Sequence, residues 1–178
     1  MRICRNLAAR NAAKPHTALI VALNATMPLD ALDRQILQRY QRDTRLPSEQ
    51  IGAQVGLSAA AVQRRLKRLR EAGVIVAETA QLDCRQLALG VTAIVNVDLH
   101  DESARAMHAF RDKVLARPEV QQCYGVTGPV DYVLIVIVPD LAAYEAFCND
   151  CLLHDPNVRG YNTQIVLEAA LRSAPLAF

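Results

Sequence analysis

The sequence predicts an α+β protein, with an N-terminal winged helix-turn-helix followed by a ferredoxin-like βαββαβ domain. Three observations support this fold class. Apolar residues recur every three or four positions between Asp30 and Ala72, as in amphipathic helices. A glycine turn at Gly56 separates two of these helices, and the second is rich in arginine. After Gly90 the apolar residues alternate, in segments ordered as strand, helix, strand, strand, helix, strand.

The first two helices are marked by their start signals. Asp30 is placed to cap a helix that ends near Tyr40 and turns its apolar side chains inward. After a polar loop at 42–45, Pro47 opens a second helix, for which we expect Ser48 to be the N-cap.

The third helix is expected over 59–72. Ser58 precedes it as N-cap, and Gly73 follows it at the position where glycine adopts the left-handed conformation without penalty. The short apolar runs 74–76 and 80–82 then predict the two strands of a wing.

One stripe of the third helix is apolar, and most of the remainder is basic. Val62, Leu66 and Leu69 fall at i, i+4 and i+7, so they face a core. The basic residues are Arg64, Arg65, Lys67, Arg68 and Arg70. Such a helix can dock its apolar stripe on the domain and present its polar face to the major groove of DNA. The plainer alternative is a solvated basic face on an ordinary helical hairpin.

The second half of the chain carries the alternating pattern. The expected elements are a strand over 91–99, a helix capped by Ser103, strands over 120–127 and 132–138, a helix capped by Asp140 and a strand over 158–167. We therefore divide the chain into a basic extension (1–27), a winged helix-turn-helix (28–82), a connector (83–90), a ferredoxin-like domain (91–170) and a tail (171–178).

Charge is distributed unevenly, although the formal net charge is only +2. Residues 1–27 carry a net +4 and residues 28–81 a net +3, whereas residues 82–178 carry −5. This asymmetry indicates a polyanion-binding module joined to a part that avoids nucleic acid. For residues 1–26 two hypotheses stay open: Met27 is the functional start, or the segment forms a mobile basic arm.

Neither a membrane protein nor an enzyme is indicated. No apolar run approaches the roughly 18 residues of a membrane helix, and the five scattered cysteines fit free thiols in the cytoplasm. Cys148 and Cys151 form a C-x-x-C on the apolar side of a predicted helix, so core packing is favoured over zinc or redox chemistry. We find no nucleophile elbow, phosphate loop or H-E-x-x-H motif, and we expect no cofactor.

The motifs of both halves resemble the Lrp/AsnC (leucine-responsive regulatory protein and asparagine-operon regulator) family of transcription regulators. The resemblance spans about residues 28–170 and omits the N-terminal extension. It is carried by Leu29-Asp30-x-x-Asp33-x-x-Ile36-Leu37, Val55-Gly56-Leu57-Ser58, Arg64-Arg65-Leu66-Lys67-Arg68-Leu69, Gly73-Val74-Ile75, Val126-Thr127-Gly128-x-x-Asp131-Tyr132, Pro156-x-Val158 and Thr163-x-Ile165-Val166.

The resemblance implies a sequence-specific regulator that binds double-stranded DNA as a homodimer, tetramer or octamer. Because only some polar side chains can reach base edges, the expected DNA-binding residues have different roles. Gln63, Arg64 and Lys67 are expected on base edges, Ala60 and Ala61 near thymine methyl groups, Arg65 and Arg68 on phosphates or in intramolecular pairs, and Ser48 and Ser58 at the helix starts beside them.

The resemblance also implies a small effector, such as an amino acid, near the loop between the second and third strands at an interface between dimers. Carried over by position, its pocket comprises Gly125, Thr127, Gly128, Asp131, Leu141 and Gln164. Gly128 permits a tight turn, and Asp131 can hold an ammonium group, although the same four-residue segment is also a good hairpin turn. Relatives carry polar or aromatic residues where this chain has Pro129-Val130, so we expect an effector other than leucine, or none.

Two alternative functions stay open. The first is a small-molecule-sensing oligomerisation module with a weak DNA contact. The second is a thiol sensor that uses Cys148 and Cys151.

Overall fold

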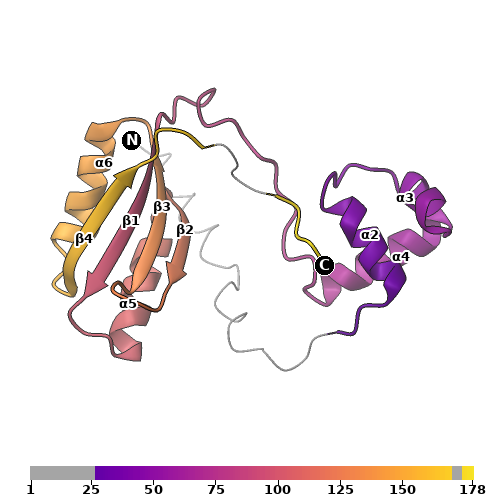
Figure 1. The fold of residues 1–178 in the computed structure, drawn as a ribbon, viewed down its shortest axis with the longest axis horizontal. Helices are drawn as coiled ribbons and strands as arrows, with labels where there is room; N and C mark the ends of the chain where they lie inside the picture. Colours follow the sequence, from indigo (N-terminus) through magenta and orange to yellow (C-terminus); the bar gives the residue numbers. More distant parts are fainter. Residues whose placement is uncertain (1–26, 170–173) are drawn as a thin grey trace, which may run out of the picture. The chain divides into compact units, whose positions relative to one another are not determined.

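The structure, a computed structural model, describes residues 27–169 and 174–178 (Figure 1). The expected extension over 1–26 lies outside the described residues. The described chain forms two compact units, one containing 27–81 together with 174–178 and the other containing 82–169. Each unit is described by itself below.

Three helices make up the first unit: α2 (Ala31–Tyr40), α3 (Ser48–Val55) and α4 (Ala59–Glu71). Asp30 caps α2, as predicted, and does so reciprocally. Its carboxylate accepts from the Asp33 amide at 2.7 Å, while the Asp33 carboxylate accepts from the Asp30 amide at 3.3 Å. Ser58 caps α4 by accepting from the Ala61 amide at 3.2 Å, which confirms the cap predicted for this helix.

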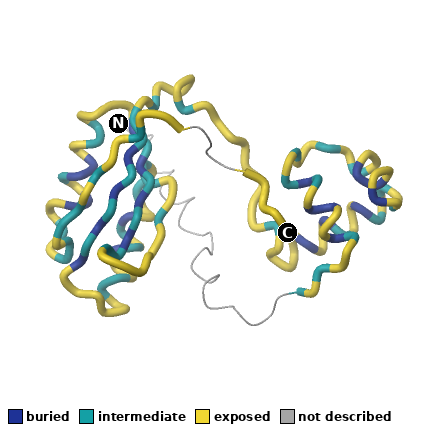
Figure 2. Tube along the Cα trace, viewed as in Figure 1, coloured by how far each residue is buried: buried dark blue, intermediate teal, exposed yellow. Residues whose placement is uncertain are grey.

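The core of this unit lies where the three helices meet. Its buried side chains occupy the apolar positions of the 3.6-residue period: Ile36, Tyr40, Ile51, Val55, Val62 and Leu66. Buried residues are dark blue in Figure 2. α4 ends before Gly73, which has the left-handed φ of 71° that was expected there. The apolar stripe of α4 is therefore the surface that holds this helix on the domain.

Two local expectations for this unit are wrong. Residues 74–82 contain no strand, so the predicted wing is absent. The Val74 and Ile75 amides instead donate to the Leu69 carbonyl at the end of α4, at 2.9 and 3.1 Å, so they are not available to pair with another strand. Ser48 is the first residue of α3 rather than its N-cap, because Pro47 occupies the cap position and no side chain caps this helix.

The second unit confirms the ferredoxin-like fold. Its elements are β1 (Val91–Leu99), α5 (Ala104–Leu115), β2 (Val120–Gly125), β3 (Tyr132–Val138), α6 (Leu141–Cys148), a π-helical turn η2 (Asn149–Leu153) and β4 (Val158–Ile165). The strands form one antiparallel sheet in the order β2-β3-β1-β4. β2 and β4 are each two residues shorter than predicted, and Ser103 and Asp140 cap the helices as expected.

The two faces of the sheet differ. Helices α5 and α6 cover one face, where alternate residues of β1 and β3 are fully buried together with Phe110, Val114 and Phe147 (Figure 1). The intervening residues point to the other face, and Ile94 of β1 lies directly opposite Ile135 of β3 there. Among the described residues no helix covers this second face, which carries the half-buried apolar side chains of Ile94, Val133, Ile135 and Ile137 beside the polar Thr92, Asn96 and Asp98. We call it the open face.

Cys148 and Cys151 lie in the core of the second unit, as the sequence predicted. Burial raises the pKa of the Cys151 thiol, which disfavours the reactive thiolate and argues against a thiol sensor. Leu141, the first residue of α6, is 60% exposed.

In the part of the chain that the structure describes, no helix combines the length and apolar character needed to cross a membrane. Residues 27–169 and 174–178 likewise contain no group of three or more His, Cys, Asp or Glu side chains arranged to hold a metal ion.

Candidate DNA-reading helix and effector loop

The turn between α3 and α4 depends on two glycines. Gly56 has a φ of 73°, which non-glycine residues rarely adopt. Gly52 is buried, and a Cβ there would lie 2.3 Å from the Leu57 carbonyl oxygen, so only glycine lets the turn pack this closely. Gly56 was predicted from the sequence, whereas Gly52 was not. The available signal was a glycine between Ile51 and Val55 on the apolar side of a helix, where glycine is costly unless backbones approach.

Two arginines of α4 hold that helix against α2. Arg65 donates through Nη1 to Asp30 at 2.7 Å and to Asp33 at 2.8 Å, and Arg68 donates through Nη2 to Asp33 at 2.5 Å. The Asp33 carboxylate is fully buried, so it is held by its charged partners rather than by water. We call Asp30, Asp33, Arg65 and Arg68 the helix clamp.

The acidic and basic residues of the helix clamp stabilise each other's charged forms. The Arg65 guanidinium holds the pKa of the Asp30 carboxyl below its ordinary value, and Asp30 and then Asp33 raise the pKa of Arg65. Of the two roles expected for Arg65 and Arg68, phosphate contact or intramolecular pairing, the structure shows the second.

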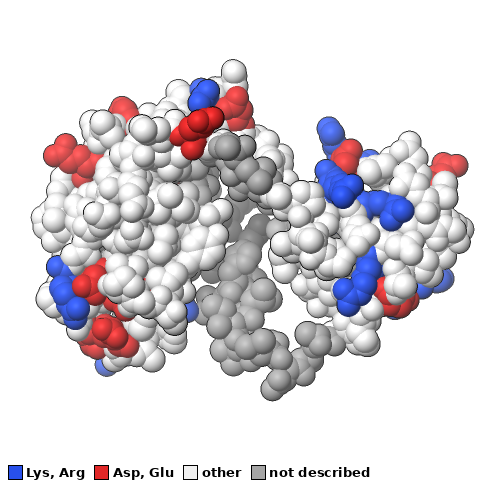
Figure 3. All heavy atoms as spheres, viewed as in Figure 1, with Lys and Arg blue, Asp and Glu red and all other residues white. Residues whose placement is uncertain are grey.

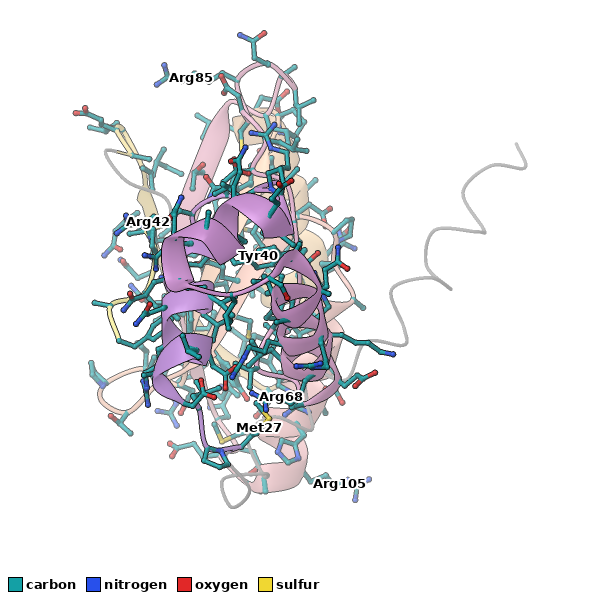
Figure 4. All side chains as sticks on the ribbon, turned by 90° about the vertical axis from the view of Figure 1, so that its right-hand side faces the viewer. Met27, Tyr40, Arg42, Arg68, Arg85 and Arg105 are labelled. Carbon is teal, nitrogen blue, oxygen red and sulfur yellow. The ribbon has the colours of Figure 1, made fainter. Side chains whose placement is uncertain are left out.

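A third arginine of α4 holds the segment that follows the helix. Arg70 donates to the Glu78 carboxylate at 2.8 Å and to the Tyr40 hydroxyl at 2.7 Å, while Tyr40 donates to Glu78 at 2.9 Å. The Arg70 guanidinium holds the pKa of Glu78 low, whereas burial raises that of Tyr40. We call Tyr40, Arg70 and Glu78 the connector anchor; Tyr40 and Arg68 are labelled in Figure 4.

The side chains of α4 that remain form one exposed stripe. Gln63 and Arg64 are exposed, and neither side chain has a hydrogen-bond or ion-pair partner among the described residues. Lys67 is exposed and has only a 3.8 Å ion pair with Glu71, which is too solvated to hold it in place. Ala60 is exposed in the same row. Positions 60, 63, 64 and 67 follow the helical spacing of i, i+3, i+4 and i+7, and we call them the reading face.

The other expected DNA-binding residues lie beside this stripe. Ala61 is half-buried, and the exposed Ser58 uses its hydroxyl to cap α4. Ser48 is half-buried in the first turn of α3. Basic side chains gather on the face of this unit seen in Figure 3.

The predicted effector loop joins β2 to β3. Gly128 adopts a φ of 128°, which requires glycine. Asp131 ties the loop to β1, because its carboxylate accepts from the Leu99 amide at 2.7 Å and its own amide donates to the Val97 carbonyl at 2.9 Å. Within residues 27–169 and 174–178, only one carboxylate oxygen of Asp131 accepts a hydrogen bond. The residue therefore serves the turn and can still offer an oxygen to a ligand.

The six predicted effector residues do not form one cluster within the chain. Gly125, Thr127, Gly128 and Asp131 lie where β2 ends and β3 begins. Leu141 follows the far end of β3, and Gln164 lies on the edge strand β4, where it pairs with Ile94 in the middle of β1. Leu141 therefore lies at the opposite end of the sheet from the loop, whereas Gln164 lies on the strand at the opposite edge from β2.

Comparison with known proteins covers both units. Residues 29–70 match the family model described as the AsnC-type helix-turn-helix domain, and residues 92–176 match the Lrp/AsnC ligand binding domain. The Bkd operon transcriptional regulator of Pseudomonas aeruginosa is 36% identical over 148 residues, which cover 83% of this chain and 97% of that protein. The leucine-responsive regulatory protein of Escherichia coli is 32% identical over 145 residues, or 82% of this chain and 88% of that protein.

Solved structures give the same result. A transcriptional regulator of Neisseria meningitidis in complex with L-Met superposes with a TM-score of 0.77 at 31% identity, covering 84% of this chain and 97% of that one. An AsnC family transcriptional regulator of Agrobacterium tumefaciens has the same TM-score and coverage at 33% identity. With both halves of its fold matched in order, the chain belongs to the Lrp/AsnC family of transcriptional regulators.

Proposed function

We propose that this regulator recognises its DNA site through the reading face of α4. The observation that supports this assignment is the division of the basic residues of this helix. Arg65, Arg68 and Arg70 are held by acidic or phenolic partners of the same unit, whereas Arg64 has none among the described residues. Arg64, Gln63 and Lys67 can donate to base edges, and Ala60 can contact a thymine methyl group.

The experiment is a salt titration of binding to the DNA fragment upstream of the protein's own gene, followed by fluorescence anisotropy. Arg64→Ala should weaken specific binding by roughly 1–3 kcal/mol, as expected for loss of a bidentate base contact. Arg105→Ala removes the same charge from an exposed position of α5 and should leave affinity unchanged. Equal affinity of wild type and Arg64→Ala would refute the reading face. Binding that shows no salt dependence would favour a sensing module with a weak DNA contact instead.

We propose that the protein acts as a homodimer joined through the open face of its sheet. Ile94, Val133, Ile135 and Ile137 place branched apolar side chains on this face, which a second sheet can cover at the usual spacing of about 10 Å. Ile135→Lys should shift the protein toward the monomer in sedimentation experiments. Leu153→Lys, at an exposed position of η2, is the matched control and should not.

An amino acid is the effector that we propose. It would bind at the loop between β2 and β3, where the free oxygen of Asp131 can accept from an ammonium group. The L-Met complex of the Neisseria regulator supports this ligand class. Because Leu141 lies at the other end of the sheet and Gln164 on its opposite edge strand, a pocket that used all six residues would need two subunits. Assembly beyond a dimer is therefore part of the proposal.

A thermal-shift screen of amino acids tests this site, because a ligand that binds the folded state raises the melting temperature. Asp131→Asn keeps an oxygen that can accept from the Leu99 amide but removes the charge. It should therefore preserve the unliganded melting temperature and abolish the ligand-induced shift. An undiminished shift would show that Asp131 serves only the turn.

Because a DNA-binding regulator must reach the chromosome, we also propose a cytoplasmic location.

A further inference from the structure

The tail at 174–178 packs with the helix-turn-helix unit rather than ending in isolation. The Leu176 amide donates to Gln41 Oε1 at 2.9 Å, and Gln41 Nε2 donates back to the Leu176 carbonyl at 2.9 Å. Gln38 Nε2 donates to the Phe178 carbonyl at 2.7 Å. Gln38 in α2 and Gln41 at its C-cap thus bind three main-chain groups of the tail: the Leu176 amide and the carbonyls of Leu176 and Phe178. These groups lie at least 135 residues away in sequence.

The contact recognises backbone rather than side chains. One carboxamide satisfies both the donor and the acceptor of a single residue, as a neighbouring strand does in a sheet. The Leu176 side chain remains 75% exposed, so it contributes little to the contact. Pro175 favours an extended conformation in the preceding residue and so helps to present the tail in the form that this pairing requires.

The residue next to Gln41 holds the other segment that leads to the effector domain. Tyr40 belongs to the connector anchor through its bond to Glu78, and Gln41 holds the tail. The loop 42–45, the segment 78–81 and residues 174–176 line a groove of about 790 Å³ at this place. The segment that contains Glu78 and the tail are therefore held at neighbouring positions, Tyr40 at the end of α2 and its C-cap Gln41.

We propose that the C-terminal end of α2 is a dock for the chain's own tail at 174–178, and that this dock couples the effector domain to the reading helix. The chain leaves the helix-turn-helix unit through the segment 78–81, and the tail belongs to this unit again after β4. α2 contributes Asp30 and Asp33 to the helix clamp at its other end, so one rigid helix links the dock to α4. The coupling rests on the proposed function, whereas the docking does not.

Amide hydrogen exchange of the full chain, measured by NMR without DNA, tests the docking. The Leu176 amide should exchange about five- to tenfold more slowly than an unbonded tail amide, the protection expected from one weak solvent-exposed contact. Gln41→Ala should abolish this protection, and Gln35→Ala, an exposed glutamine of the same helix, should leave it intact. An unprotected Leu176 amide, or unchanged protection in Gln41→Ala, would overturn the dock. Protection that grows with protein concentration would place the tail on a second copy and would also overturn it.

Two variants of the tail itself test the coupling. Leu176→Pro removes the donor N–H without altering the helix-turn-helix unit, whereas Leu176→Ala keeps both main-chain bonds. In ¹⁵N relaxation, amides of 27–81 should show a shorter rotational correlation time in Leu176→Pro than in Leu176→Ala, with amides of 91–165 unchanged. Identical values would refute the coupling. Because neither measurement uses DNA, loss of the docking and failure of the reading-face assignment are separate outcomes.

Discussion

Asp33→Asn is the most direct perturbation of the helix clamp. The substitution keeps the shape of the side chain but removes the charge that Arg65 and Arg68 share. A hydrogen bond to a charged group is worth about 1.5–3 kcal/mol, and breaking a buried ion pair costs about 3–5 kcal/mol. The side chains of Arg65 and Arg68 are 22% and 50% exposed, so water can compensate part of the loss. We therefore expect the free energy of unfolding to fall by about 2–3 kcal/mol, which is less than breaking a fully buried ion pair would cost.

Urea unfolding of Asp33→Asn, followed by circular dichroism, measures this loss as a lower midpoint with an unchanged slope. Glu71→Gln breaks the exposed ion pair with Lys67 and is the matched control, with an expected change below about 0.5 kcal/mol. Releasing two arginines toward phosphates should also steepen the salt dependence of DNA binding, by up to about 0.9 per added contact. A free energy of unfolding within about 0.5 kcal/mol of wild type would refute the clamp as a structural device.

Further predictions concern the turn between α3 and α4 and the stability of the protein at acidic pH. Gly52→Ala should destabilise the helix-turn-helix unit by more than about 2 kcal/mol, because the added Cβ would overlap the backbone at Leu57. The Cβ added by Gly56→Ala would meet open space, so this variant should lose only about 1–2 kcal/mol, the cost of the left-handed φ. Equal losses of unfolding free energy in urea would contradict this difference. The pKa values of Asp30 and Glu78 are lowered from 3.8 and 4.5, so their contributions to stability are complete above those values and are lost as the pH falls below them. Urea midpoints measured from about pH 6 to pH 3 should fall, and should fall less in Arg65→Gln; parallel curves would argue against the ion pair of Arg65 with Asp30.

Local signals predicted much of the fold. The caps Asp30, Ser58, Ser103 and Asp140 were identified because a side chain that accepts from an amide three residues ahead is a short-range interaction. β3 matches its predicted bounds, since strict alternation over a half-buried surface leaves little freedom of register.

The errors concern contacts that no short window contains. The wing was predicted from two apolar runs, but the amides of Val74 and Ile75 bond back to α4, and Glu78 bonds to Tyr40, 38 residues earlier. The roles of Arg65 and Arg68 stayed open in the sequence for the same reason, because their partners lie on another helix. The effector set looked like one pocket until antiparallel pairing placed Leu141 and Gln164 away from the loop.

The separation of the helix clamp from the reading face has a consequence for how such a regulator can change its target. The side chains that orient α4 and those that face outward are different residues of one helix. On the proposed assignment, substitutions at 60, 63, 64 and 67 should redirect the protein to a new operator while the scaffold stays the same. Evolution, or an engineer building orthogonal gene switches, can vary these four positions as a library and leave the rest of the domain untouched.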